Sequence, residues 1–197
     1  MATVNYGKKE IQFKIVYYGP GMCGKTTNLQ IIHEKMPSQS KGKMASLATS
    51  QDRTLFFDFL PLKAEAIEGF VTKFQMYTVP GQVKYNSTRK LVLRNCDGVV
   101  FVADSQLSKM QENIESLQNL EENLQDQNDT LKKMPFVLQY NKRDLPEIAP
   151  TEYMDFILNN GSVKVPALTA SAIKGEGVTE TLNAIAKLVL QNFVENH

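Results

Sequence analysis

Residues 13–35 read FKIVYYGPGMCGKTTNLQIIHEK, and this stretch decides the fold. It joins an apolar run, which predicts a buried strand, to the pattern Gly, four residues, Gly, Lys, Thr at positions 19–26, and then to a helical segment. Glycines let the backbone curl so that successive N–H groups face inward, and the N-terminus of the next helix adds partial positive charge. The sequence therefore predicts a phosphate-binding loop between a strand and a helix.

Two side chains of this loop have specific expected roles. Lys25 reaches the terminal phosphates of a nucleotide as a point charge, and the Thr26 hydroxyl is placed to bind magnesium. Cys23 lies at the start of a helix, a position that favours a lowered thiol pKa. The alternative interpretation is a Gly-rich strand-to-helix turn that binds nothing. The nucleotide-binding residues predicted here are Gly19, Gly21, Met22, Cys23, Gly24, Lys25, Thr26 and Thr27.

A second motif predicts which base is bound. Asn141-Lys142-Arg143-Asp144 follows the apolar run 135–140, and so stands at the carboxyl end of a strand, where open α/β sheets bind ligands. Asp144 can accept hydrogen bonds from the N1–H and the exocyclic amine of guanine, a donor pair that adenine lacks. We expect the Lys142 stem to lie along the base and Asn141 to tie this loop to the phosphate loop. The alternative is an ordinary polar turn.

A third stretch completes the predicted base site. Residues 169–172 follow the apolar run 163–168, and the backbone N–H of Ala172, beside Ser171, is well placed to donate to O6 of guanine. Together the three stretches predict GTP or GDP as the ligand. A P-loop kinase or ATPase is disfavoured by Asp144, because an adenine would leave the carboxylate unpaired.

Strands and helices alternate along the chain, which is typical of a mostly parallel, doubly wound α/β sheet with helices on both faces. The strands 54–60 and 70–78 are too close in sequence to be linked by a helix, so they predict one antiparallel hairpin at an edge. The other expected strands are 11–18, 98–103, 135–140 and 163–168, and the expected helices are 25–35, 84–94, 108–126, 151–159 and 178–194.

The length of 197 residues is that of a single domain, which we expect to span the whole chain. The helix from Ser108 carries an apolar stripe, with Glu and Asn elsewhere, and this stripe predicts its core-facing side. Its members are Met110, Ile114, Leu117, Leu120 and Leu124.

These motifs, in this order, resemble the Ras-like small GTPases, and more closely their bacterial MglA-like branch of polarity and motility GTPases. The resemblance spans residues 10–195, and its most specific parts include 53–62, 77–82 and 98–105. It implies a Ras-like P-loop GTPase domain that binds GTP or GDP with Mg²⁺. It also implies a molecular switch that hydrolyses GTP slowly alone and faster with a roadblock-type MglB-like dimer, and that acts on effectors of cell polarity or gliding motility.

The resemblance also assigns catalytic residues. Gln82 matches the glutamine that orients the attacking water, and Gly81 precedes it. Thr54 is expected to meet magnesium in the GTP state, with Thr49 as the alternative. Arg53 is expected to act as an internal arginine finger, the alternative being a solvated loop arginine or a partner contact.

One nucleotide-site residue departs from the pattern of most such GTPases. Thr78 stands where they carry the Asp that holds magnesium through water, although the MglA-like branch shares this Thr. Asp52 and Asp58 are candidate replacements for the missing carboxylate. Residues 37–53 are polar and weakly patterned and predict a mobile loop. The competing function is a nucleotide-binding scaffold with negligible turnover, which Thr78 favours and Gln82 opposes.

Charge, cysteines and termini exclude other classes. The 22 basic and 21 acidic residues give a net charge of +1. This balance predicts no excess of positive charge that would attract nucleic acid or anionic lipid. The two cysteines form no pair motif and no zinc spacing. The chain has no signal peptide, no myristoylation or prenylation signal and no run of 18 apolar residues. We therefore expect a cytoplasmic protein without a direct membrane anchor, recruited to a cell pole by partners.

Overall fold

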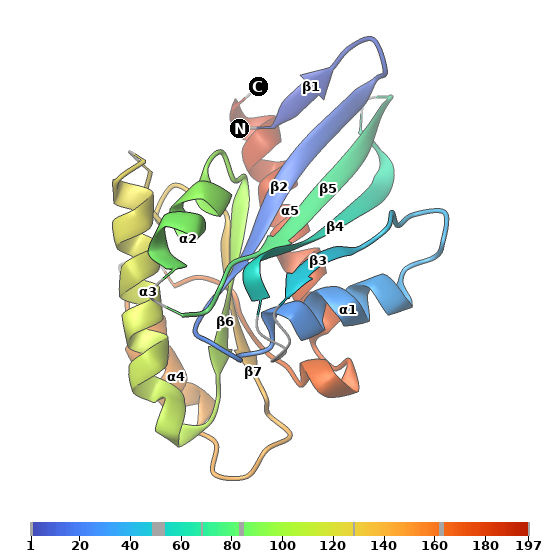
Figure 1. Cartoon of the computed structure of the whole chain (residues 1–197). Helices are drawn as coiled ribbons and strands as arrows, with labels where there is room; N and C mark the ends of the chain where they lie inside the picture. Colours follow the sequence, from blue (N-terminus) through green and yellow to red (C-terminus); the bar gives the residue numbers. More distant parts are fainter. Residues whose placement is uncertain are drawn as a thin grey trace.

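The computed structural model of the chain describes residues 2–48, 54–67, 69–82, 85–127, 129–161 and 164–196, and for 46–48, 54–60 and 63–67 the backbone alone. Within these ranges, a central sheet carries helices on both faces (Figure 1). The strands are β1 Thr3–Asn5, β2 Glu10–Tyr18, β3 Ala45–Ala48, β4 Thr54–Ile67, β5 Phe70–Thr78, β6 Gly98–Asp104, β7 Phe136–Asn141 and β8 Ala167–Thr169. The helices are α1 Lys25–Lys35, α2 Asn86–Leu93, α3 Met110–Gln125, α4 Thr151–Leu158 and α5 Val178–Asn196, with short 3₁₀ helices η2 Leu107–Lys109 and η3 Ala172–Lys174.

The sheet is mixed, with its parallel part at the centre. The described residues give the strand order β3-β4-β5-β2-β6-β7-β8, with β1 paired to the first residues of β2. β2 runs parallel to β5 and β6, and the ladder continues in parallel through β7 and β8. β4 is antiparallel to both of its neighbours. The predicted mostly parallel sheet with an antiparallel hairpin is confirmed.

The sheet separates two apolar cores. Ile15 and Tyr17 of β2 face the core that α1 and α5 cover, whereas Val16 and Tyr18 face the core under α2, α3 and α4. All residues of β6 and β7 are buried, as expected of parallel strands between two layers of helices. The loops after β2, β5, β6 and β7 leave this buried centre at the carboxyl ends of parallel strands, where α/β sheets bind ligands.

β4 is longer than predicted, because residues 61–67, expected to join two strands, extend it. The carbonyl of Pro61 accepts from the Gly42 N–H at 2.9 Å, on the side away from β5. In an antiparallel ladder the N and O atoms of one residue point to the same side, so the missing N–H of Pro61 costs no bond to β5. The chain then reverses at Gly69, whose φ of 82° lies in the left-handed region.

Two strands were not predicted. β1 pairs with β2 through a turn in which Asn5 Oδ1 accepts from the Lys8 N–H at 3.0 Å. β3 lies inside residues 37–53, which were expected to form a loop, and it pairs with β4 at the outer side of the sheet. The predicted hairpin therefore lies beside the outermost strand. The four residues of β3, Ala-Ser-Leu-Ala, are too few to stand out within a polar segment, and pairing with β4 makes them a strand.

β8 is shorter than predicted and spans Ala167–Thr169. The side chain of Asn159 takes both backbone groups of Val165, accepting from its N–H and donating to its carbonyl, each at 3.0 Å. The backbone of Val165 is therefore unavailable to a strand ladder. Pro166, which has no N–H, follows it.

The five predicted helices are present in the described residues. α1 has the predicted bounds, and the ends of the others differ by at most two residues. The buried side of α3 differs from prediction, because Asn113, Asn119 and Asn123 lie in the interior with Leu120 and Leu124. Asparagines expected on the outer side are thus part of the polar interior of the protein.

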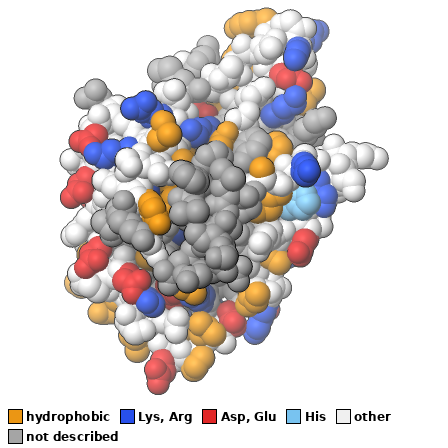
Figure 2. Space-filling view, in the orientation of Figure 1, with side chains coloured by type: hydrophobic (Ala, Val, Ile, Leu, Met, Phe, Trp, Pro, Cys, Tyr) orange, Lys and Arg blue, Asp and Glu red, His pale blue; other side chains and the backbone are white. Residues whose placement is uncertain are grey.

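The described surface carries mixed charge. On the face drawn in Figure 2, Lys and Arg side chains are interspersed with Asp and Glu. None of the helices in the described ranges is long and apolar enough to cross a membrane.

Candidate nucleotide site

The loop between β2 and α1 contains two positions that only glycine can occupy. Gly19 has φ 139°, and a Cβ atom there would lie 2.2 Å from the carbonyl oxygen of Val102 in β6. Gly24, at the N-cap of α1, has φ 103°, and its Cβ would lie 2.2 Å from the side-chain nitrogen of Asn141. These glycines let the loop sit directly against the neighbouring strand ends.

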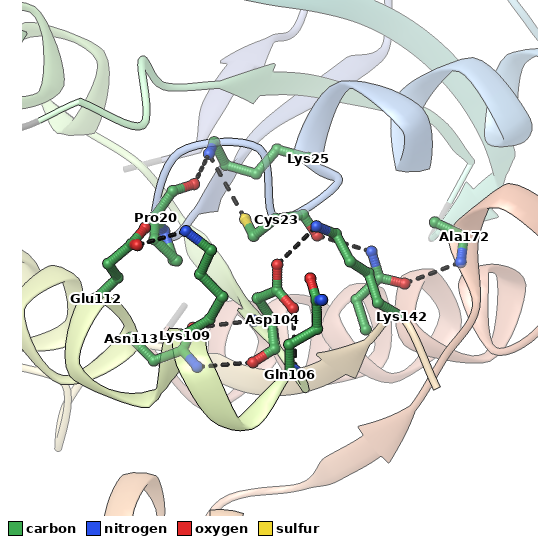
Figure 3. A network of polar contacts seen from close by, with 11 residues as sticks. Pro20, Cys23, Lys25, Asp104, Gln106, Lys109, Glu112, Asn113, Lys142 and Ala172 are labelled. Atoms are coloured by element: carbon green, nitrogen blue, oxygen red, sulfur yellow. Dashed lines mark hydrogen bonds and ion pairs between the residues drawn. The ribbon is translucent and has the colours of Figure 1, made fainter. Parts of the chain in front are cut away.

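Lys25 points back into this loop (Figure 3). Its ammonium donates to the carbonyls of Gly19, at 3.0 Å, and Pro20, at 2.6 Å, and the whole side chain is buried. Thr26 and Thr27 follow in the first turn of α1 and are partly exposed. The arrangement places one cation and the N-terminus of a helix at the same loop, which favours an anion there.

The predicted lowering of the Cys23 thiol pKa is wrong. The Cys23 side chain is fully buried, and burial raises the pKa of the thiol. The Lys25 ammonium, 3.6 Å from the sulfur, opposes this rise without reversing it. The N-terminus of a helix lowers a thiol pKa only where the thiolate keeps access to solvent or to a strong partner.

Asn141 joins the two loops that the sequence predicted it would join. Its side-chain nitrogen donates to the carbonyl of Cys23 at 2.8 Å, and its side-chain oxygen accepts from the Ala172 N–H at 2.9 Å. One buried amide thus connects the phosphate loop, the end of β7 and the loop after β8. The Ala172 N–H, predicted to donate to guanine O6, already has Asn141 as an acceptor and would share its hydrogen between the two.

Lys142 and Asp104 form an ion pair at this edge of the sheet (Figure 3). The ammonium and Oδ2 are 2.6 Å apart, and Asp104 is 1% exposed. The Asn113 side chain fixes the Asp104 backbone through both its N–H, at 2.9 Å, and its carbonyl, at 2.8 Å. Asp104 was not predicted as a site residue, although an acidic residue at the carboxyl end of a buried strand was a usable signal.

Asp144 lies beside Ser171, a residue of the third stretch predicted to form the base site. The Ser171 hydroxyl donates to Asp144 Oδ1 at 2.6 Å and holds the pKa of this carboxyl below its usual value. The carboxylate is therefore charged at neutral pH. It can accept hydrogen bonds from a base that carries two adjacent donors.

Residues 78–82 lie against the phosphate loop. Thr78, at the end of β5, is buried. A Cβ atom on Gly81 would lie 2.3 Å from Cα of Gly21 and 2.7 Å from the carbonyl oxygen of Pro20. The two backbones therefore touch, and Gln82, the next residue and partly exposed, stands beside the phosphate loop.

Five predicted residues lie outside the described residues or are described by their backbone alone. Arg53, Thr49 and Asp52 lie outside the described residues, and of Thr54 only the backbone is described, as the first residue of β4. Asp58 pairs with Ser46 across β4 and β3, again through described backbone alone. In the ranges whose side chains are described, no three His, Cys, Asp or Glu residues gather in a group that could hold a metal ion.

A buried polar network beneath the first turn of α1 supports the phosphate loop, and no sequence motif predicted it. Gln139 of β7 exchanges two hydrogen bonds with Asn28 of α1, at 2.8 and 2.9 Å, and donates to Thr181 of α5 at 2.9 Å. Asn28 also donates to the carbonyl of Gly24 at 2.9 Å. The start of α1 is thereby fixed to the sheet and to α5.

Comparison with known proteins identifies the family. A model of the ADP-ribosylation factor family matches residues 2–189. The chain is 56% identical over 190 residues to the mutual gliding-motility protein MglA of Myxococcus xanthus, and the match covers 96% of each chain. It is 27% identical over 191 residues to the Ypt/Rab-type GTPase ypt7 of Schizosaccharomyces pombe, across 94% of this chain and 86% of the relative. Because the family model and the Myxococcus relative both match nearly the whole length, this chain belongs to the ADP-ribosylation factor family of Ras-like small GTPases, in their MglA-like branch, and is a GTPase that binds guanine nucleotides.

Proposed function

We propose that this protein is a one-domain molecular switch that hydrolyses bound GTP to GDP and phosphate and changes the conformation of its phosphate-sensing loops when it does so. The observation that carries the proposal is the contact of Gly81 with Gly21, which brings Gln82 to the phosphate loop. A third phosphate bound at that loop lies beside the Gln82 segment, so its presence or loss changes what the segment contacts.

The nucleotide is recognised at both ends. Gly19, Gly21, Met22, Cys23, Gly24 and Thr27 would surround the phosphates with Lys25, and Asn141, Lys142, Asp144, Ser171 and Ala172 would surround the base. The Asp144 carboxylate, charged at neutral pH and oriented by the Ser171 hydroxyl, would accept from the two donors of guanine. An adenine leaves that charge unpaired, and a polar site discriminates strongly against a base that lacks its partners.

Magnesium fits the donor set proposed for it. Thr26, in the first turn of α1, would supply one hydroxyl, and Thr54, the first residue of β4, would supply a second. The phosphates and water would supply the remaining oxygens, which are the ligands this ion prefers. When bound, magnesium neutralises charge on the β- and γ-phosphates. Buried Thr78 contributes a hydroxyl and no charge at the position where most such GTPases carry Asp.

Hydrolysis needs a positioned water and a stabilised phosphoryl group. We assign the first task to the Gln82 side chain, which orients the attacking water, and the second to Lys25 and to Arg53 acting in cis. An arginine in that role raises the rate by about 1,000-fold or more in related phosphoryl-transfer enzymes. Slow turnover of the isolated protein is expected when Arg53 enters the site only with a partner bound.

The cellular role is proposed from the relative. The Myxococcus protein is named for gliding motility, and we propose the same output here, through effectors that bind the GTP form. The proposed activator is a roadblock-type MglB-like dimer. We further propose that the protein works in the cytoplasm without a membrane anchor and is brought to a cell pole by its partners.

A single-turnover measurement tests the proposal. GTP-loaded protein is mixed with magnesium and the conversion of GTP is followed for wild type, Gln82→Ala and the matched control Gln111→Ala, which alters an exposed glutamine of α3. We expect wild type and the control to convert GTP at the same rate and Gln82→Ala to be at least about 100-fold slower. Tight GTP binding with no conversion in any of the three would instead support a nucleotide-dependent scaffold.

The activator is tested in the same assay. An MglB-like dimer is added to GTP-loaded wild type and to Arg53→Ala. Acceleration of wild type by about 100-fold or more and little acceleration of Arg53→Ala would support an arginine acting in cis. Equal acceleration of both proteins would assign the catalytic cation to the partner.

A further inference from the structure

Arg89 is a charged side chain in the apolar layer between α2 and the sheet. It lies in the middle of α2 and is 0% exposed, and it is the largest fully buried side chain among the described residues. Neither the phosphate-loop motif nor the base motif includes it. A buried guanidinium loses its hydration, so its surroundings must supply hydrogen bonds to most of its N–H groups.

Two of those hydrogen bonds go to the loop that carries Gln82. The Nε atom of Arg89 donates to the carbonyl of Pro80 at 2.8 Å, and one terminal nitrogen donates to the carbonyl of Gly81. These are the two residues immediately before Gln82, and Gly81 is the residue that touches the phosphate loop. The planar guanidinium therefore grips two successive peptide groups, which a single ammonium cannot do in the same geometry.

The other terminal nitrogen is anchored on the far side. It donates to Oδ1 of Asn119 in α3 at 2.7 Å and lies 3.4 Å from the Tyr18 hydroxyl, while the guanidinium stands 5.2 Å from the centre of the Tyr18 ring. Tyr18 also donates to Asn119 at 2.7 Å, and Asn123 donates to the Tyr18 hydroxyl at 3.1 Å. Arg89 thus connects the Pro80–Gly81 segment to two buried side chains, Tyr18 of β2 and Asn119 of α3.

The choice of arginine at position 89 indicates a role beyond filling space. The oxygens that accept from Arg89 are carbonyl, amide and phenol oxygens, so the charge does not gain the attraction of a salt bridge in these contacts. A Met or Leu side chain would fill similar volume without the cost of burying a charge, but it would leave the carbonyls of Pro80 and Gly81 without these donors. The two carbonyls need two N–H donors held in one plane, and the guanidinium group supplies them.

We propose that Arg89 is a positioning residue for GTP hydrolysis, which holds the Pro80 and Gly81 carbonyls so that Gln82 stays against the phosphate loop. This rests on the proposed role of Gln82 in orienting water. Arg89 itself contacts neither the nucleotide nor the water in this scheme. Its loss should slow hydrolysis, because a displacement of about 1 Å at a catalytic group can lower a rate about 100-fold, and should leave nucleotide affinity nearly unchanged.

The test uses two substitutions and a matched control. Arg89→Met removes all the donors, Arg89→Lys keeps the charge without the fork, and Arg94→Met alters an exposed arginine just after α2. Each GDP-loaded protein is analysed by hydrogen–deuterium exchange of the peptide that contains Pro80 to Gln82. GDP affinity and single-turnover hydrolysis of GTP are measured on the same proteins.

The expected pattern is specific. Exchange in that peptide rises in both Arg89 variants and not in Arg94→Met, while the peptides of the phosphate loop and of residues 141–144 keep the wild-type exchange. Hydrolysis falls about 100-fold in Arg89→Met and about tenfold in Arg89→Lys, with GDP affinity within about threefold of wild type. If Arg89→Met does not fold, Arg89→Lys carries the test by itself.

Two results would overturn the inference. One is unchanged exchange at Pro80 to Gln82 in both Arg89 variants. The other is a uniform rise of exchange over the chain with GDP affinity and hydrolysis reduced alike, which would mean that Arg89 serves overall stability alone. If wild type itself does not convert GTP, the proposed hydrolysis fails, and the exchange data still decide whether Arg89 holds the loop.

Discussion

The base end of the site and the loop that carries Gln82 are held in place in different ways. At the base end the contacts run between motif residues, since Asn141 joins the phosphate loop to Ala172 and Ser171 holds Asp144. The loop at residues 80–82 is held by backbone contact with Gly21 and by residues outside any motif, with Arg89 at their centre. The residues that recognise the nucleotide therefore lie in short sequence motifs. The position of residues 80–82 (the catalytic loop) depends instead on side chains that are distant in sequence.

The largest expected effect is at the base end. Asp144→Asn replaces an acceptor of two hydrogen bonds from guanine by a neutral amide, and each charge-assisted hydrogen bond contributes about 1.5–3 kcal/mol. We expect GTP affinity to fall by about 100-fold or more, and single-turnover hydrolysis of the GTP that remains bound to stay near the wild-type rate. Equilibrium titration with a fluorescent GTP analogue, followed by a saturated single-turnover assay, measures both.

The control is Glu147→Gln, which neutralises an exposed carboxylate a few residues further along the same loop. It should leave GTP affinity unchanged. A loss of affinity in Glu147→Gln comparable to that in Asp144→Asn would mean that general negative charge, and not pairing with guanine, decides binding.

The second effect is at the catalytic loop. Gly81→Ala places a methyl group 2.3 Å from Gly21 Cα, so the two backbones must separate. We expect hydrolysis to fall about 100-fold while GDP affinity changes by about threefold or less, the reverse of the pattern in Asp144→Asn. Gly7→Ala is the control, because the nearest atom to its Cβ would be 3.6 Å away. Parallel losses of affinity and rate would show that the two ends of the site are not independent.

The difference between motif contacts and contacts of distant residues also explains which features could be predicted from the sequence. The phosphate loop, the bounds of α1 and the Asn141 contact followed from local patterns, because the residues that form them are neighbours in sequence or follow strands that end at the same edge of the parallel sheet. The asparagines of α3 were misassigned to the outer side, since a polar residue belongs in the interior only if a distant partner such as Tyr18 meets it there. The roles of Arg53 and Thr54 stay predictions.

A third, smaller effect is expected beneath the phosphate loop. Gln139→Leu removes the partner of Asn28 in the buried network that fixes α1 to the sheet. Leaving a buried amide unpaired costs about 1–3 kcal/mol, so we expect the free energy of unfolding to fall by about 2 kcal/mol. Urea denaturation of the GDP-loaded protein measures this, with the exposed Gln125→Leu as control. A change below about 0.5 kcal/mol would mean that Asn28 finds another partner.

The smallest effect concerns an exposed polar link between α2 and the end of α3. Lys90 pairs with Asp126 at 2.6 Å on the surface, one residue along the helix from buried Arg89. Exposed pairs contribute about 0–1 kcal/mol and weaken with salt, so Lys90→Met should lower the unfolding free energy by less than about 1 kcal/mol and leave hydrolysis unchanged. Denaturation and single-turnover assays at low and high salt measure this. If Lys90→Met slowed hydrolysis as much as Arg89→Met, the contacts between α2 and α3 as a whole would position the catalytic loop, and the hydrogen bonds from Arg89 to the Pro80 and Gly81 carbonyls would not be the specific cause.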